Sequence, residues 1–183
     1  MADVVTVVKQ DYAKEANNYE TYWSGSSVPF ARLDVELFVS ALGQATGETV
    51  LDLAGGSGIK ARVALDAGAA AIDIVDISGE MIREGKKVEE GLGRNKIRWF
   101  EADITKPLDH LPLHPQYDIV LAHWPFDHAE NMAALEGMFC NVVSHMKPGG
   151  RFFGVRCCDP RAPAMTSGGL ASPSRTSRKS RGG

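Results

Sequence analysis

Length, composition and charge exclude several classes of protein. The chain has 183 residues, 44% of them hydrophobic, which suits one domain with a substantial buried core. No apolar stretch approaches the roughly 20 residues of a membrane span, and the start of the chain lacks the basic and apolar segments of a secretory signal. We therefore expect a soluble, cytoplasmic protein.

The charge is unevenly distributed along the chain. The net charge is −3, but residues 159–183 hold five basic side chains against one acidic, and the other 158 residues hold 15 basic and 22 acidic. An acidic body is a poor match for a nucleic-acid backbone and favours a small-molecule partner. Residues 159–183 have few large apolar side chains, which predicts a disordered basic tail. Its run at 174–181 is a solvated segment or a contact to RNA or a membrane surface.

The three cysteines, Cys140, Cys157 and Cys158, form an odd set without the spacing of a zinc site. They indicate neither a disulfide framework nor a bound metal. We expect them to be buried free thiols.

Helical spacing of apolar residues predicts two helices at the start of the chain, over 4–23 and 30–45. After Gly47 the pattern changes to short apolar strands that alternate with helical segments. The strands are expected at 49–53, 71–75, 97–100, 119–122 and 151–155, and the helices near 58–67, 79–91 and 130–146. This alternation is typical of βαβ units and predicts an α/β fold with a parallel sheet.

We divide the chain into a helical cap over 1–46, a ligand-binding core over 47–158 and the tail over 159–183. The last helix of the core has an apolar stripe at helical spacing, which we expect to face the core. Its members are Met132, Leu135, Phe139, Val142 and Met146.

A glycine-rich turn directly follows the first predicted strand. Residues 50–58 read Val-Leu-Asp-Leu-Ala-Gly-Gly-Ser-Gly, and Asp52 places a carboxylate at the end of the strand. Glycines allow positive φ close to a ligand, and the following helix offers unpaired N–H groups and a partial positive charge. The arrangement predicts a nucleotide-type site. Residues 56–61 also satisfy the dinucleotide pattern G-x-G-x-x-G/A, so the loop alone does not choose between cofactors.

Asp76 ends the second predicted strand, 18 residues beyond Gly58. A carboxylate at that place can accept hydrogen bonds from both ribose hydroxyls of either cofactor class. The alternative is a surface or helix-capping aspartate.

Five segments, in order, resemble the motifs of class I S-adenosylmethionine-dependent methyltransferases. They are residues 50–58, 75–82, 100–104, 117–122 and 146–152. The Ala-Gly-Gly form of the first is similar to the loop of ubiquinone and menaquinone biosynthesis methyltransferases, and the last contains a Lys-Pro-Gly-Gly turn. The resemblance covers most of residues 10–156. It implies a Rossmann-like sheet, S-adenosyl-L-methionine as cofactor, and methyl transfer to a small-molecule acceptor, with secondary metabolism as the expected pathway.

The resemblance also implies roles for the glycine-rich turn and the second strand. Asp52 and the loop backbone at Ala54, Gly56 and Gly58 would hold the amino-acid end of the cofactor, where a carboxylate can pair with an ammonium group. Asp76 would bind the ribose.

By the same resemblance, Asp103 would accept a hydrogen bond from the adenine amino group. The apolar walls around the ring would be Ile77, Met81 and Ile104. Tyr12 and Tyr19 lie seven residues apart on one face of the first helix, which resembles the cofactor-covering helix of the family. Core packing is the alternative for the apolar residues and for both tyrosines.

Two histidines follow the fourth predicted strand, His123 and His128. If the acceptor is a hydroxyl, either imidazole could take its proton near neutral pH. The alternative is that they cap or pack the loop. Trp124 and Phe126 between them would line an apolar acceptor pocket or close the core.

The class I fold continues beyond its fifth strand with a helix and two further strands, whereas here the fifth strand runs into the basic tail. We therefore expect a sheet without those two strands, and an exposed edge at which a second copy could bind. Two alternatives to an active methyltransferase stay open. One is a non-catalytic, truncated S-adenosylmethionine-binding protein. The other is an NAD(P)-dependent oxidoreductase, which leaves Asp52 and residues 147–150 unexplained.

Overall fold

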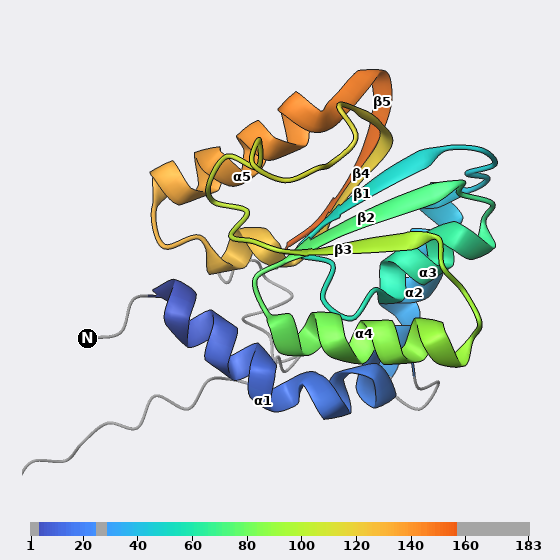
Figure 1. Ribbon diagram of the computed structural model, residues 1–183, viewed down its shortest axis with the longest axis horizontal. Coiled ribbons are helices and arrows are strands. Elements are labelled where there is room, and N and C mark those ends of the chain that lie inside the picture. Colours follow the sequence, from blue (N-terminus) through green and yellow to red (C-terminus); the bar gives the residue numbers. More distant parts are fainter. Residues whose placement is uncertain (1–3, 25–28, 157–183) are drawn as a thin grey trace, which may run out of the picture.

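The computed structural model describes residues 4–24 and 29–156, and it places one twisted sheet between two layers of helices (Figure 1). The strands are β1 (Thr49–Leu53), β2 (Ala71–Asp76), β3 (Ile97–Glu101), β4 (Tyr117–His123) and β5 (Met146–Val155). The helices are α1 (Val4–Ser24), α2 (Pro29–Leu42), α3 (Ile59–Asp66), α4 (Gly79–Gly91), α5 (Met132–His145) and the short 3-10 helix η1 (Pro125–His128).

All neighbouring strands run parallel, in the order β3-β2-β1-β4-β5. The chain moves outward from β1 to β3 and then returns to the other side of β1 with β4. Ligands of such sheets bind outside the carboxyl ends of the strands where the order reverses, here between β1 and β4. The sheet confirms the predicted α/β, Rossmann-like fold, and five strands are present in the described residues.

Alternation along each strand sends successive side chains to opposite faces of the sheet. Val50 on β1 contributes to the core beneath α2 and α3, and its neighbour Leu51 to the core beneath α5. Both are fully buried. In Figure 1, α5 covers one face, while α1 to α4 lie on the other side. Nearly continuous apolar strands are what a parallel sheet covered on both faces requires.

The start of β5 differs from the predicted turn. Between the pairs Tyr117–Met146 and Ile119–Arg151, residues 147–150 stand opposite Asp118 alone, so the Lys-Pro-Gly-Gly segment is an irregularity within the strand. Lys147 Nζ lies 2.7 Å from Asp118 Oδ1, and this contact holds the irregular segment against β4. The strand therefore begins five residues earlier than the sequence pattern predicted.

The predicted core stripe of α5 is wrong in part. Val142 is buried, but Met132 is 67% exposed and Phe139 is 42% exposed. The buried face consists of Met138, Asn141, Val142 and His145. Asn141 is buried because its amide donates to the carbonyls of Ile104 and Lys106, and a polar residue in that role is invisible to apolar periodicity.

The expectation of buried thiols is wrong for Cys140, which lies on the outward face of α5 and is exposed. Cys157, Cys158 and the tail at 159–183 lie outside the described residues. No helix in the described part of the chain is long and apolar enough to cross a membrane.

Helix α4 fits closely against the glycine-rich turn through Gly85. A Cβ on this residue would lie 2.6 Å from the carbonyl oxygen of Ser57 and would overlap the indole of Trp99. Gly91 ends the same helix and would have no atom within 4 Å of an added Cβ.

We therefore predict that Gly85→Ala lowers the free energy of unfolding by roughly 1–3 kcal/mol, because overpacking forces the turn and the helix apart. Gly91→Ala is the matched control and should be neutral or stabilising by up to about 1 kcal/mol, the gain in helix propensity. Urea unfolding followed by circular dichroism measures both. Equal effects of the two substitutions would contradict close packing at Gly85.

Candidate functional site

The turn after β1 is built from residues that adopt left-handed backbone angles. Ala54, Gly56 and Gly58 have φ values of 59°, 57° and 87°, and Gly58 caps the start of α3. Gly55 has no room for a side chain, because a Cβ would lie 2.7 Å from the Asp52 carboxyl group and 2.9 Å from Ile74. The turn therefore folds back directly over Asp52.

Asp52 lies beneath this turn and is almost fully buried, with 1% of its surface exposed. Its Oδ2 atom has no hydrogen-bond partner among the described residues. Burial, with a further contribution from nearby Asp76 and against the opposing charge of Lys60, raises the pKa of Asp52 to about 7. A buried carboxylate without a full set of partners is stabilised by a cation or a hydrogen-bond donor placed nearby.

Asp76 ends β2 beside the turn and ties the two segments together. Its Oδ2 accepts a hydrogen bond from the N–H of Gly56 at 2.7 Å, and its Oδ1 accepts one from the N–H of Ser78 at 2.8 Å. Burial raises the pKa of Asp76 to about 6 despite these bonds, which favour the ionised form. Each carboxylate oxygen keeps a further lone pair that can accept a ligand hydroxyl.

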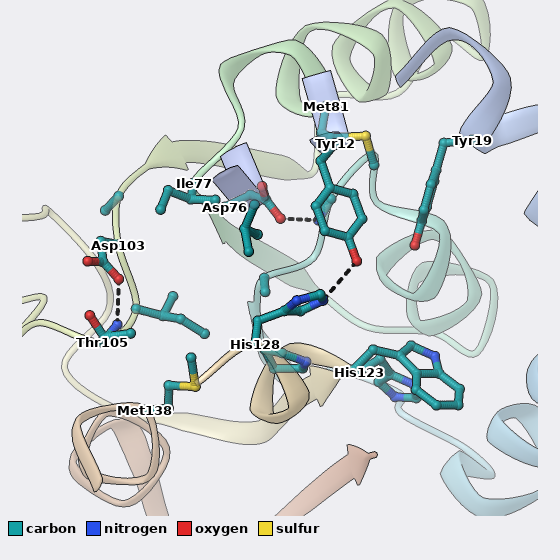
Figure 2. Close-up of a pocket in the computed structure, with 17 residues that line it drawn as sticks. Tyr12, Tyr19, Asp76, Ile77, Met81, Asp103, Thr105, His123, His128 and Met138 are labelled. Atoms are coloured by element: carbon teal, nitrogen blue, oxygen red, sulfur yellow. Dashed lines mark hydrogen bonds between the residues drawn. The ribbon is translucent and has the colours of Figure 1, made fainter. Parts of the chain in front are cut away.

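A cavity of about 250 Å³ opens at the carboxyl ends of the strands, where the topology predicts a ligand (Figure 2). Its lining includes eleven of the sequence-predicted site residues. Those residues are Tyr12, Tyr19, Gly56, Asp76, Ile77, Met81, Asp103, Ile104, His123 and His128, together with Ala54.

Helix α1 covers this cavity and is held in place by polar contacts. Tyr12 Oη lies 3.1 Å from His128 Nε2, and the rings of Tyr12 and Tyr19 meet edge to face at 6.2 Å (Figure 2). Burial raises the pKa of Tyr19, with the nearby Tyr12 and Asp76 adding to the effect, so its phenol stays a hydrogen-bond donor. Lys9 of the same helix pairs with Glu101 at the end of β3.

The end of β4 brings both predicted histidines to the opposite wall. His123 is the last strand residue, Trp124 follows with a left-handed φ of 70°, and His128 ends η1. Burial and the charge of Lys60 lower the pKa of His123 to about 4, against the opposing effect of Asp34. His123 is thus neutral at pH 7, and His128 lies nearer to the covering helix through Tyr12.

Two predicted residues do not line the cavity, and several lining residues were not predicted. Asp52 lies behind the turn and Gly58 at the start of α3, so neither faces the open space. The unpredicted lining residues are Val8, Ala102, Thr105, Pro125 and Met138, while Trp124 lines the cavity as one of its two predicted roles allowed. Helical spacing could have found Val8, four residues before Tyr12. Thr105 could have been found by its place two residues after Asp103, whose Oδ1 accepts its N–H at 2.8 Å.

Known structures resemble this one in fold. A DhpI complex with SAH superposes with a TM-score of 0.67 at 23% identity, over 86% of this chain and 71% of that one. The N-methyltransferase NodS of Bradyrhizobium japonicum, also in complex with S-adenosyl-l-homocysteine, gives a TM-score of 0.63 at 17% identity, over 79% and 71% of the two chains. At these identities the likeness shows the shared fold.

Among curated proteins, the demethylmenaquinone methyltransferase of Tropheryma whipplei (strain Twist) is 31% identical over 123 residues. The match covers 66% of this chain and 46% of that protein, so the chain spans about half the length of the curated relatives it matches.

The family model described as a methyltransferase domain matches residues 50–150, from β1 to the irregularity in β5. This range holds all of β1 except its first residue, the strands β2 to β4, and the carboxylates Asp52 and Asp76. The chain belongs to the methyltransferase domain family.

Proposed function

We propose that this chain binds S-adenosylmethionine in the cavity beneath α1 and transfers its methyl group to a small-molecule acceptor. The observation that carries the proposal is the gathering of the turn, Asp76 and Asp103 around one cavity, with apolar residues between the carboxylates. The family membership and the SAH-bound structures with the same fold support this choice of cofactor.

Asp76 and Asp103 suit the two ends of an adenosyl group. The carboxylate of Asp76 can accept the ribose hydroxyls with the lone pairs that Gly56 and Ser78 leave unused. Asp103 uses Oδ1 for Thr105, and its Oδ2 can accept from the adenine amino group. Ile77, Met81 and Ile104 supply the apolar walls that an aromatic ring requires.

The glycine-rich turn suits the amino-acid end of the cofactor. A Cβ on Gly56 would lie 3.0 Å from the Met81 methyl group. Because glycine lacks that atom, a ligand can approach the backbone at this point. Asp52 lies behind this surface, and we propose that its negative charge favours an ammonium group at the turn without lining the cavity. Gly58 would act through the start of α3, where unpaired N–H groups favour a carboxylate.

When bound, the cofactor supplies a methyl group on a positively charged sulfur, and that charge disappears as the group is transferred. The chain contributes position and shielding, since α1 with Tyr12 and Tyr19 covers the cavity and excludes water. For a hydroxyl acceptor, we propose that His128 takes the proton as the new bond to carbon forms. The bond to Tyr12 orients its ring. With a pKa of about 4, His123 is a weaker base than an ordinary histidine and suits a neutral hydrogen-bonding role.

The name of the Tropheryma whipplei relative supports a small, apolar acceptor for this chain too. Secondary metabolism, a cytoplasmic location and the lack of a nucleic-acid partner stay predictions of the sequence. A second copy at the edge of the sheet also stays a proposal. It is supported by the place of β5 at the end of the strand order and by two exposed aromatic residues, Phe152 on β5 and Phe139 on α5.

We predict that Asp76→Ala weakens the binding of S-adenosylhomocysteine by roughly 1.5–3 kcal/mol, because hydrogen bonds to a charged group are lost. Isothermal titration calorimetry measures this. Asp118→Ala is the control, since Asp118 pairs with Lys147 and Thr49 at the other end of the sheet and should affect stability without changing affinity. Unchanged affinity in Asp76→Ala would remove the ribose role. Binding of NAD(P) in place of S-adenosylhomocysteine would support the oxidoreductase alternative.

The raised pKa values of the buried carboxylates predict a pH dependence of binding. A ligand ammonium group favours ionised Asp52 and protonation competes with it, so affinity should fall as pH falls through about 7, the pKa of Asp52. Between pH 8 and pH 5 we expect a loss of roughly tenfold or more in S-adenosylhomocysteine affinity. Asp52→Asn should bind more weakly at pH 8 and lose much of this dependence, leaving the contribution of Asp76, whose pKa is about 6. An equally steep profile in Asp52→Asn would contradict the role of Asp52.

Substitution of His128 separates an effect on catalysis from an effect on cofactor binding. His128→Gln should reduce methyl transfer by roughly a hundredfold, the scale of general-base catalysis, while S-adenosylhomocysteine affinity changes little. Transfer of a radiolabelled methyl group from S-adenosylmethionine to a panel of small phenols, naphthols and amines measures the activity. Equal turnover by wild type and variant would make His128 structural. Tight cofactor binding without transfer to any acceptor would support the non-catalytic alternative.

A further inference from the structure

Three buried nitrogen atoms at the end of β4 lack hydrogen-bond partners among the described residues. They are Nδ1 and Nε2 of His123 and Nε1 of Trp124. The indole nitrogen can only donate, and a neutral imidazole has one donor and one acceptor. Leaving such groups unpaired away from water costs free energy, so their position requires an explanation.

The same two residues line a second cavity next to the first. This cavity has a volume of about 370 Å³ and lies between α2 and the end of β5. Its walls are largely apolar and include Phe30, Leu33, Phe38 and Phe153. His123 and Trp124 border both cavities, so they stand where a molecule in the second cavity would meet a methyl donor in the first.

Among the described residues that line it, the second cavity offers no uncompensated charge. Asp34 is its one acidic lining residue, and it forms a buried ion pair with Lys60. His123 is neutral at pH 7, since its pKa is lowered to about 4. A charged molecule would therefore lose its hydration here without gaining a counter-ion.

The backbone holds Trp124 in an unusual conformation at this junction. Its φ of 70° is a left-handed angle that a bulky side chain rarely adopts. The N–H of Trp124 donates to the carbonyl of Val155 at 2.8 Å, and its ring contacts Phe30 at 5.7 Å between centroids. Strained residues that are held in place by their surroundings cluster at ligand sites.

We propose that the second cavity binds the methyl acceptor, and that the acceptor is an uncharged, apolar ring carrying a hydroxyl group held by Trp124 Nε1 and a ring nitrogen of His123. A hydroxyl oxygen can accept from the indole N–H and still keep a lone pair for reaction, whereas a neutral amine nitrogen has only one lone pair. In the bound state the hydroxyl hydrogen is donated to the imidazole of His123, and it leaves to His128, the proposed base, as the bond between the oxygen and the methyl carbon forms. This assignment rests on the proposed methyl transfer and names its substrate class.

The test uses 2-naphthol and naphthalene as probes, which share a ring system and differ in the hydroxyl group. Calorimetry with the protein in saturating S-adenosylhomocysteine should show that 2-naphthol binds at least roughly tenfold more tightly. Trp124→Phe keeps an aromatic ring without the N–H and should lose most of that advantage, while naphthalene affinity stays within about threefold. Trp99→Phe is the control, because Trp99 packs against Gly85 and borders neither cavity. A cationic probe, 1-naphthylmethylamine, should not bind.

His123→Phe supplies an independent readout. Removing two unpaired buried nitrogens should raise the Tm of the ligand-free protein, while the preference for 2-naphthol falls. If His123 had only a structural role, its replacement would not raise the Tm and lower the preference for 2-naphthol at the same time.

Equal binding of 2-naphthol and naphthalene to wild type, or a retained preference in Trp124→Phe, would overturn the assignment. Failure of S-adenosylhomocysteine to bind would instead overturn the proposed function. Naphthol binding can be measured without that ligand, so the two failures are distinguishable.

Discussion

The site depends on one hydrogen bond, from the N–H of Gly56 to Oδ2 of Asp76 at 2.7 Å. It fastens the turn after β1 to the end of the neighbouring strand, so that two segments 20 residues apart form one wall. Because the other oxygen of Asp76 accepts the N–H of Ser78, the same carboxylate also fixes the start of α4. Position of the turn, direction of the helix and a ligand-facing charge therefore follow from a single side chain.

This arrangement concentrates unfavourable features at the carboxyl ends of the strands. Asp52 and Asp76 place two buried carboxylates near each other, and each raises the energy of the other's ionised form. Ala54 and Trp124 hold left-handed φ angles that side chains disfavour, and each such residue costs of order 1–3 kcal/mol. The fully buried residues of the cores on both faces of the sheet have no left-handed φ angle, and their burial offsets these costs. The buried carboxylates and the left-handed backbone angles therefore lie together at the place where a bound ligand would stabilise them.

The sequence predicted most of the strands and helices, because the patterns that define them are local. The limits of β1 and α4 agree with the structure, and the cofactor residues of the turn and of β2 and β3 fall around or behind one cavity. Predictions were poorer where a long-range contact decides the outcome. Asn141 replaces apolar residues on the buried face of α5 because two distant carbonyls bind it, and no spacing rule contains that information.

The pairing of Tyr12 with His128 shows the same limit within the site itself. The two residues are 116 positions apart, and each was predicted separately, one as part of a cover and the other as a base. Only the packing of α1 across the crevice reveals that they touch. The left-handed angle at Trp124 was likewise not foreseeable, since the residue is bulky and its N–H donates to the carbonyl of Val155, a contact between segments distant in sequence.

The way in which α1 is held also explains how a covered cavity can exchange its contents. Among the residues of α1 with a described burial, Ala16 is the one hydrophobic residue that is buried, whereas the inner strands β1, β2 and β4 bury almost every apolar side chain. The helix is fastened instead by side-chain contacts such as Lys9 to Glu101, which is half-exposed, and Glu20 to Arg62. The Lys9–Glu101 pair is exposed, and such pairs contribute at most about 1 kcal/mol each, whereas the Glu20–Arg62 pair is largely buried. Separating α1 from the crevice therefore costs less free energy than disrupting any inner strand, so the site can open while the sheet that positions Asp76 stays intact.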